Sequence, residues 1–310
     1  MIEVKGISKK FNQNQALDQI SFTVKQGEVL GFLGPNGAGK TTTMKIITGF
    51  WQPDQGSVYV AGIDMAKDSL SARRKIGYLP ETVPLYDEMK VFEYLKFVAE
   101  ARDIEKDNLI PHIKSVAESC GLQDVIGKSI EDLSKGYRQR VGLAQAIMHN
   151  PDILILDEPT TGLDPNQIVE IRDLIKKVGK EKTVIFSTHI LAEAQATCDR
   201  VMIINHGKIV GEGRPEELAK TVSANAYHLQ IKGEPGNAIQ ALQNLSGVLR
   251  VEIVNQGSEN FEYQIQPQDG IDAREQIAQC ALGHGWLILE FSQQPTSLEE
   301  VFRVLTKESN

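Results

Sequence analysis

Cysteines, aromatic residues and long apolar runs are all scarce in this 310-residue sequence. Its three cysteines, Cys120, Cys198 and Cys280, are odd in number and lie far apart, which argues against a disulfide framework or a metal motif and suits a reducing compartment. No apolar run approaches the ~20 residues of a membrane-spanning helix, and the N-terminus lacks the apolar core of a signal peptide. We therefore expect a soluble, cytoplasmic chain with ordinary buried thiols.

An excess of positive charge is also missing. The net charge is −8 at pH 7, and residues 221–310 alone contain 11 acidic and only 5 basic side chains. General nucleic-acid binders usually carry a basic footprint. The composition therefore argues against a nucleic-acid partner, and the acidic last third is a poor docking surface for DNA or anionic lipid.

A glycine-rich phosphate-binding motif stands between a predicted strand and a predicted helix. The motif G-x-x-x-x-G-K-[ST] is matched by Gly34-Pro35-Asn36-Gly37-Ala38-Gly39-Lys40-Thr41-Thr42. Residues 28–33 before it are typical of a buried strand, and residues 41–48 after it are typical of a helix. In such a loop, backbone N–H groups and the helix dipole attract phosphate, while Lys40 reaches the outer phosphates and Thr41 can hold Mg²⁺.

The order of strand-like and helix-like segments predicts an α/β domain with a mostly parallel sheet. Strands are expected at 2–7, 20–24, 57–60, 153–156, 183–187 and 201–205, with a helix at 167–178. Apolar residues at helical spacing in 91–102, 109–120 and 137–148 predict a helical insertion over about 88–148. Ligands of such sheets bind beyond the carboxyl ends of the strands, where the phosphate-binding loop falls.

The pattern changes after Arg214-Pro215, where a short helix at 216–220 is expected to close a first domain, 1–220. For 221–310 we predict a small α+β domain with the βαββαβ order of a ferredoxin-like unit, followed by a helix at 297–306. Its six segments are 227–231, 238–245, 248–254, 261–266, 273–282 and 287–291. The residues expected in its core are Leu229, Ile231, Leu242, Val251, Ile253, Ile277, Leu287 and Leu289. With no chemical motif, this domain is either a structural appendage or a regulatory module that contacts a second subunit.

Two further predicted strands end in residues suited to phosphoryl transfer. The strand 153–156 is followed by Asp157 and Glu158, which could supply a ligand to Mg²⁺ and a base to a water facing the γ-phosphate. The strand 183–187 is followed by Thr188 and His189, and a histidine there could hydrogen-bond the γ-phosphate. An acidic turn or a single histidine by itself more often has a structural role. A catalytic role is favoured here because both follow apolar strands of the same predicted sheet.

With Leu133-Ser134-Lys135-Gly136-Tyr137 between these motifs, residues 1 to about 220 resemble the ATP-binding subunits of ABC transporters. The resemblance implies a Walker A loop, an LSGGQ-type signature at 133–137, a Walker B strand ending at Asp157, a catalytic Glu158, a D-loop with Asp164 and a switch His189. It implies that ATP lies between two such domains, with the signature of one facing the Walker A loop of the other. Phe11 occupies the position of the aromatic ring that stacks on adenine, although a plain core role for it stays open.

Two positions depart from the family pattern. Lys135 and Tyr137 replace Gly and Gln in the signature, whereas Ser134 and Gly136, which phosphate needs most, are kept. The Q-loop Gln, which contacts Mg²⁺ and the membrane subunit in the family, is replaced by Glu81. A carboxylate can still ligate Mg²⁺, and the alternative is that Glu81 faces solvent. The chain also resembles a narrower group, the gliding-motility-associated ATPase subunits of type-2 ABC exporters. This resemblance rests on the run YLPE at 78–81, the signature run and residues 297–305.

The resemblance therefore implies an ATPase that uses ATP and Mg²⁺, and that dimerises on ATP as a homodimer or with a paired ATPase subunit. It would power a separate integral-membrane permease, as part of an exporter, from the cytoplasmic face of the cell membrane. The alternative is a regulatory ABC ATPase that moves no solute. Translation-type members resemble tandem domains, repair-type members carry a long coiled coil, and a GTPase would need Asn-Lys-x-Asp, none of which is present here.

Overall fold

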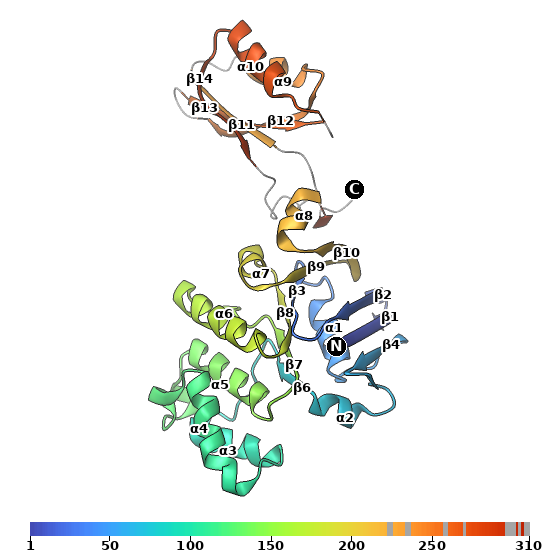
Figure 1. The fold of residues 1–310 in the computed structure, drawn as a ribbon, viewed down its shortest axis with the longest axis vertical. Coiled ribbons are helices and arrows are strands. Elements are labelled where there is room, and N and C mark those ends of the chain that lie inside the picture. Colours follow the sequence, from blue (N-terminus) through green and yellow to red (C-terminus); the bar gives the residue numbers. More distant parts are fainter. Residues whose placement is uncertain are drawn as a thin grey trace. The chain divides into compact units, whose positions relative to one another are not determined.

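The computed structural model describes residues 1–221, 226–232, 237–256, 260–268 and 271–294, with the single positions 302, 305 and 306. It divides into two compact units (Figure 1). The first comprises Met1–Pro215 and Leu305–Asn310, and the second comprises Glu216–Val304. The boundary was expected at residue 220. In the structure the first unit ends at Pro215, so nearly all of helix α8 (Pro215–Thr221) belongs to the second unit, and Leu305–Asn310 belong to the first.

A six-stranded sheet forms the centre of the first unit. Its order is β10-β9-β3-β8-β7-β6, and all neighbours are parallel except β10, which runs antiparallel to β9. Every residue of β3, β7 and β8 is buried, because both faces of the sheet are covered. The predicted mostly parallel sheet is confirmed. Its strands are β3 (Val29–Leu33), β6 (Ile76–Leu79), β7 (Ile153–Asp157), β8 (Thr183–Thr188), β9 (Arg200–Asn205) and β10 (Lys208–Gly213).

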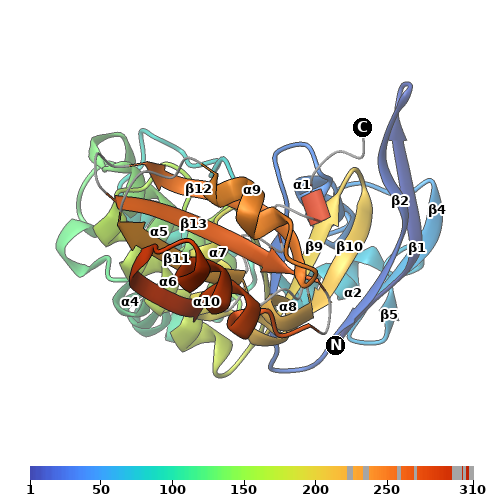
Figure 2. The same ribbon diagram turned by 90° about the horizontal axis from the view of Figure 1, so that it is seen from above.

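One face of this sheet is covered by helix α1 (Lys40–Ile47) and a second, antiparallel sheet of order β2-β1-β4-β5 (Figure 2). Apolar side chains of both sheets and of α1 form one continuous core. The sequence did not predict the long hairpin of this second sheet: β1 extends to Phe11 and β2 begins at Asn14, with Asn12 in the left-handed region at φ 54. The strands are β1 (Ile2–Phe11), β2 (Asn14–Val24), β4 (Gln55–Val60) and β5 (Ile63–Asp64).

The opposite face is covered by helices, which confirms the predicted helical insertion. A second core joins apolar residues of β3, β7 and β8 to these helices. The insertion contains α3 (Val91–Ala101), α4 (Leu109–Ser119) and α5 (Lys135–Ile147), with short 3-10 turns at Lys106–Asn108, Gln123–Val125 and Ile130–Asp132. The remaining helices of this unit are α2 (Ser69–Arg74), α6 (Pro165–Gly179) and α7 (Leu191–Thr197).

The second unit has the predicted βαββαβ order. Its four strands form an antiparallel sheet of order β12-β13-β11-β14, and both helices cover the same face (Figure 2). This is the ferredoxin-like arrangement. Most of the predicted last helix, 297–306, lies outside the described residues. The elements are β11 (Ala226–Lys232), α9 (Ala238–Gln243), β12 (Val248–Gln256), β13 (Asn260–Pro267), α10 (Arg274–Gly283) and β14 (Leu287–Gln294).

Three residues predicted for the core of the second unit were wrongly assigned. Ile253, Leu287 and Leu289 are 40%, 59% and 45% exposed. Ile253 lies in the edge strand β12, and the other two lie in the edge strand β14. A register shift in β14 pairs Ile288 with Ile231 and Phe291 with Leu229, both buried residues of β11. Leu287 and Leu289 therefore do not face the core. The five that are buried as predicted are Leu229, Ile231, Leu242, Val251 and Ile277.

Leu305 and Thr306, near the end of the sequence, contact the strands β10 and β9 of the first unit. A Cβ built on Gly211 would lie 2.9 Å from Cδ1 of Leu305, so a side chain at Gly211 would displace that leucine. The Asn205 amide donates a hydrogen bond to the carbonyl of Thr306 at 3.4 Å. The second unit is therefore connected to the first at both of its ends in the sequence.

Candidate nucleotide site

Residues from several predicted motifs meet at the carboxyl edge of the central sheet. The phosphate-binding loop follows β3, Asp157 ends β7, His189 follows β8, and Glu81 lies two residues beyond β6. There the phosphate-binding loop, Glu81 and His189 line a cavity of about 410 Å³, whereas Asp157 is not among its lining residues. It is lined by Phe11, Asn14, Ala16, Asn36, Gly37, Gly39, Lys40, Thr41, Thr42, Glu81, Glu158, Thr161 and His189.

The phosphate-binding loop is built around the Lys40 ammonium. Its Nζ donates to the carbonyl of Gly34 at 2.7 Å and to that of Pro35 at 3.2 Å. Gly39 has φ 111, and a Cβ there would lie 2.7 Å from Cδ2 of Leu17, so only glycine allows α1 to begin this close to β2. No side chain of the described residues caps the start of α1. Its N–H groups are therefore available to an anion.

The Glu158 carboxylate joins Lys40 to His189. Its Oε1 lies 3.1 Å from Lys40 Nζ, and its Oε2 accepts hydrogen bonds from His189 Nδ1 at 2.8 Å and Thr161 Oγ1 at 3.0 Å. Burial alone would raise the pKa of Glu158, but the charge of Lys40 and the hydrogen bond from His189 outweigh it, so its pKa lies below the ordinary value. Glu158 is thus held ionised, the form in which a carboxylate can accept a proton.

Asp157 and Thr41 form a second polar group beside this carboxylate. Asp157 Oδ1 accepts from Ser187 Oγ at 2.6 Å and from Thr41 Oγ1 at 3.2 Å, while its buried Oδ2 has no partner among the described residues. Burial raises the pKa of Asp157 despite these hydrogen bonds. A carboxylate oxygen without a described partner beside a threonine hydroxyl fits Mg²⁺, and both Thr41 and Glu81 line the cavity. Within the described part of the chain, no cluster of three His, Cys, Asp or Glu could hold a metal. Mg²⁺ commonly takes one or two protein ligands, with waters and substrate phosphates as the others.

Sequence reasoning missed Ser187. Its hydroxyl donates to Asp157 and accepts from the backbone N–H of Glu158 at 2.9 Å. It lies opposite Asp157 in the parallel pair of β7 and β8, so it fixes the ends of both strands. The signal was weak, because a serine at the end of an apolar strand looks like an ordinary strand terminus.

The signature residues and Asp164 of the D-loop are not among the described residues that line the cavity, although Thr161 at the start of the D-loop is. Ser134 caps α5 by accepting from the N–H of Tyr137 at 3.4 Å, and Asp164 caps α6 by accepting from the N–H of Gln167 at 2.9 Å. Helix α5 begins at Lys135 rather than at the predicted residue 137, which places Lys135 and Gly136 in its first turn. Within one chain, none of residues 134–137 is among the described residues that line the cavity.

Comparison with known proteins agrees with this geometry. The model of the ABC transporter family matches residues 17–161. The chain is 32% identical over 302 residues to the ABC transporter ATP-binding protein YxlF of Bacillus subtilis, covering 97% of this chain and 98% of that protein. It is 29% identical over 307 residues to the Nod factor export ATP-binding protein I of Ralstonia nicotianae, covering 99% and 94%.

Solved structures show the same likeness. An ATP-binding subunit of an ABC transporter matches with a TM-score of 0.65 and 30% identity, covering 71% of this chain and 92% of that one. The dimeric ABC transporter cassette MJ0796 matches with a TM-score of 0.64 and 27% identity, covering 69% and 98%. The chain therefore belongs to the ABC transporter family, as one of its ATP-binding and ATP-hydrolysing subunits.

Proposed function

We propose that this subunit binds Mg²⁺-ATP in the cavity at the carboxyl edge of the central sheet, with Glu158 as the general base. The observation that carries the proposal is the contact of buried Glu158 with both Lys40 and His189. Lys40 binds the outer phosphates, and His189 orients Glu158 and contacts the γ-phosphate. Phe11 stacks on the adenine, while residues 34–42 enclose the phosphates.

The chemistry is the attack of a water on the γ-phosphoryl group. Glu158 accepts the proton of that water as the new P–O bond forms, and ADP leaves with the electrons of the broken bond. Thr41 and Asp157, with Glu81, would hold Mg²⁺, whose charge would stabilise negative charge on the phosphates. Lys40 contributes a second positive charge from a buried position, where electrostatic interactions are stronger than in water.

We further propose that a second ATPase subunit completes each site, in a homodimer or a pair of related chains. The supporting observation is that Ser134, Lys135, Gly136 and Tyr137 form the first turn of α5 and its cap, away from the cavity of their own chain. Such a helix start can bind phosphate of a neighbouring subunit. The solved cassette MJ0796, which is similar to this chain, is described as dimeric.

A mixing experiment tests this arrangement. Lys40→Ala disables the phosphate-binding loop, and Ser134→Arg blocks the signature, so each variant alone should be inactive. In a head-to-tail dimer of the two variants, one site contains both defects and the other contains none. Random mixing should then restore about a quarter of wild-type turnover. If both motifs served a site within one chain, the mixture would stay inactive.

The membrane partner that we propose is a permease that docks on the helical insertion from the cytoplasmic face of the cell membrane. None of the helices in the described ranges is long and apolar enough to span a bilayer. Tyr86 and Phe97 are 56% and 43% exposed and pack against each other with ring centroids 5.6 Å apart. They line a groove of about 370 Å³ with Tyr94, Arg102 and Gln145. Exposed aromatic rings beside a groove are typical of a protein-binding surface.

The docking proposal predicts co-purification with a membrane protein after gentle solubilisation. Changing Tyr86 and Phe97 together to Ser should release that protein while leaving ATP turnover of the isolated subunit intact. The matched control is Leu70→Ser, which removes another exposed apolar side chain, on α2. Full ATPase activity with no membrane protein bound to the wild type would favour the non-transport regulatory ATPase.

We also propose that the transporter is an exporter of the type-2 group called gliding-motility-associated. The support comes from Glu81 in the YLPE run, from the LSKGY signature and from the near-full-length similarity to a Nod factor export protein. Reconstituting the subunit with its permease in vesicles tests the direction of transport. ATP added outside inverted vesicles should drive substrate inward.

A further inference from the structure

Phe11, the ring proposed to stack on adenine, is 37% exposed at the tip of the β1–β2 hairpin. Hairpin tips order their side chains poorly unless another group supports them. Here the ring of Trp51 packs against Phe11 with centroids 4.8 Å apart and planes at 60°. This edge-to-face geometry is the favourable one for aromatic pairs. Phe11 therefore has a support on one side and the cavity on the other.

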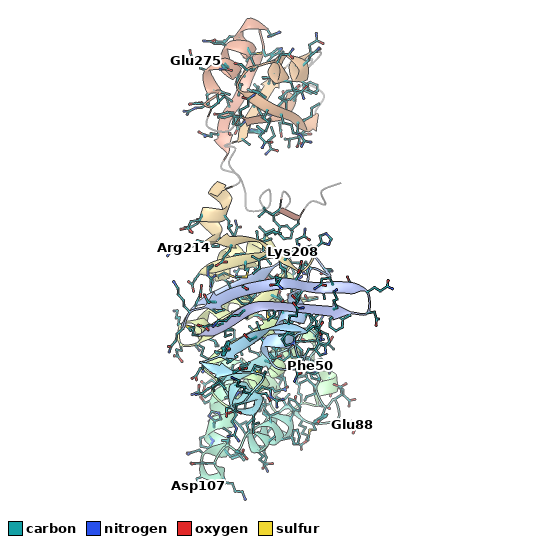
Figure 3. The ribbon with its side chains drawn as sticks, turned by 90° about the vertical axis from the view of Figure 1, so that its right-hand side faces the viewer. Phe50, Glu88, Asp107, Lys208, Arg214 and Glu275 are labelled. Carbon is teal, nitrogen blue, oxygen red and sulfur yellow. The ribbon has the colours of Figure 1, made fainter. Side chains whose placement is uncertain are left out.

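Trp51 is in turn fixed to α1, the helix that begins at the phosphate-binding loop. Its backbone N–H donates to the carbonyl of Lys45 at 3.1 Å, and the Lys45 ammonium lies 4.6 Å from the centre of its ring. The Phe50 ring packs against Trp51 with centroids 6.0 Å apart. Phe50 is 69% exposed at the surface of the first unit (Figure 3). The indole thus lies between the end of α1 and the Phe11 ring.

Asp54 fastens the same segment to β1. Its carboxylate accepts from Lys9 Nζ and from the N–H of Lys10, each at 2.7 Å, and its own N–H donates to the carbonyl of Ser8 at 2.8 Å. These bonds hold residues 51–54 along the strand that carries Phe11. Trp51 therefore links α1, which begins at the phosphate-binding loop, to β1, which ends at Phe11.

We propose that Trp51 is a positioning residue for the nucleotide base: it holds the Phe11 ring in the orientation that stacks on adenine. The inference rests on the proposed placement of ATP in this cavity. A ring already held in its bound orientation loses less conformational freedom when the base arrives. Trp51 is not among the described residues that line the cavity, and of the lining residues it is Phe11 whose ring packs against it, so we expect its effect to fall mainly on the base.

The test compares ATP with inorganic tripolyphosphate, which lacks the base. Binding of each, with Mg²⁺, is measured by calorimetry on the full-length chain. Trp51→Leu should weaken ATP binding ~3- to 10-fold and leave tripolyphosphate binding unchanged, and Trp51→Phe should restore most of the loss. Phe11→Ala combined with Trp51→Leu should be no weaker than Phe11→Ala alone, because both act through one contact. Phe50→Ala is the control: it removes an exposed aromatic ring next to Trp51 and should leave the binding of both ligands unchanged.

A second readout uses tryptophan fluorescence. The chain has two tryptophans, Trp51 and Trp286, so Trp286→Phe leaves Trp51 as the only reporter. ATP should change its emission, and tripolyphosphate should not. Unchanged ATP affinity in Trp51→Leu, or an equal loss for both ligands, would overturn the positioning role. Failure of the wild type to bind either ligand would instead overturn the proposed nucleotide site.

Discussion

Lys40 Nζ lies 3.1 Å from Oε1 of Glu158, and both side chains are almost fully buried. The positive charge proposed to bind phosphate is therefore paired with the proposed general base. Phosphate entering the loop would compete with Glu158 for Lys40. Once Lys40 binds phosphate, the carboxylate can turn to a water while His189 still holds its other oxygen. Binding of ATP and activation of the base would thus be coupled through one contact.

We expect Lys40→Ala to lower ATP turnover at least ~100-fold and ATP affinity at least ~10-fold, because it removes a buried cation from the phosphate loop. Turnover is measured by phosphate release and affinity by calorimetry. Lys67→Ala is the control, since that lysine is 84% exposed and forms a surface salt bridge with Asp64. Near-normal turnover in Lys40→Ala would contradict the assigned site.

Glu158→Gln should stop turnover, by ~100-fold or more, and should tighten ATP binding. The amide cannot accept the proton of water, and it no longer competes as an anion for Lys40. Size-exclusion chromatography with Mg²⁺-ATP, run at a concentration low enough that the wild type is mostly a monomer despite any nucleotide-independent contact, should show this variant as a dimer. Glu100→Gln, an exposed change on α3, serves as the control. Normal hydrolysis by Glu158→Gln would assign the base elsewhere.

Glu81→Gln should shift the dependence of turnover on Mg²⁺. If Glu81 helps to hold the ion, loss of its charge should raise the Mg²⁺ concentration for half-maximal rate by ~3-fold or more. Titrations of both proteins at saturating ATP measure this shift. Coincident curves would mean that Glu81 lines the cavity without taking part in metal binding.

Stability of the first unit should fall between pH 6.5 and 4 because of His149. Burial and the nearby Arg102 lower its pKa from 6.5 to about 4. The unfolded chain therefore binds a proton at His149 over this range and the folded chain does not, so unfolding becomes easier as the pH falls and this effect levels off below pH 4.

His149→Gln removes that proton uptake, and an amide can still donate to the carbonyl of Ile76 that His149 Nε2 contacts at 3.0 Å. Between pH 7 and pH 4.5, the variant should lose ~1 kcal/mol less free energy of unfolding than the wild type, a figure reduced for the partial exposure of the ring. Denaturant unfolding followed by Trp51 fluorescence in the Trp286→Phe background measures it. Equal losses in the two proteins would refute this origin of the pH dependence.

For residues 221–310 we propose an accessory module that holds two subunits together independently of nucleotide. A chain that ends at Lys220 should still bind ATP with unchanged affinity, because every residue that lines the cavity lies upstream. Its self-association without ATP should be weaker than that of the full chain, as measured by analytical ultracentrifugation. Unchanged self-association would make the module a structural appendage.

The same truncation also removes Leu305, which packs beside Gly211. Its melting temperature should therefore fall by a few degrees. A matched variant that replaces 222–301 with a flexible Gly/Ser linker retains this contact and should melt closer to the wild type. If the two variants melt alike, the tail contributes little to the stability of the first unit.

The phosphate-binding loop, the carboxylates after β7 and His189 were predictable because each belongs to a local pattern of an apolar strand followed by polar residues. Ser187 and Trp51 were not, since their roles depend on neighbours that are distant in sequence. The exposure of Leu287 and Leu289 could not be predicted from the sequence either, because a single register shift in β14 changes which of its residues face the core. Periodicity predicts that a strand exists, whereas its register depends on tertiary packing.

The contact between Leu305 and Gly211 has a consequence for how this protein is made. During translation, β10 leaves the ribosome before Leu305, which follows only after Glu216–Val304 has been synthesised. The catalytic unit therefore cannot complete its packing on a nascent chain that stops short. A prematurely terminated product would lack the Leu305 side chain beside Gly211 and would leave more of β10 exposed to water.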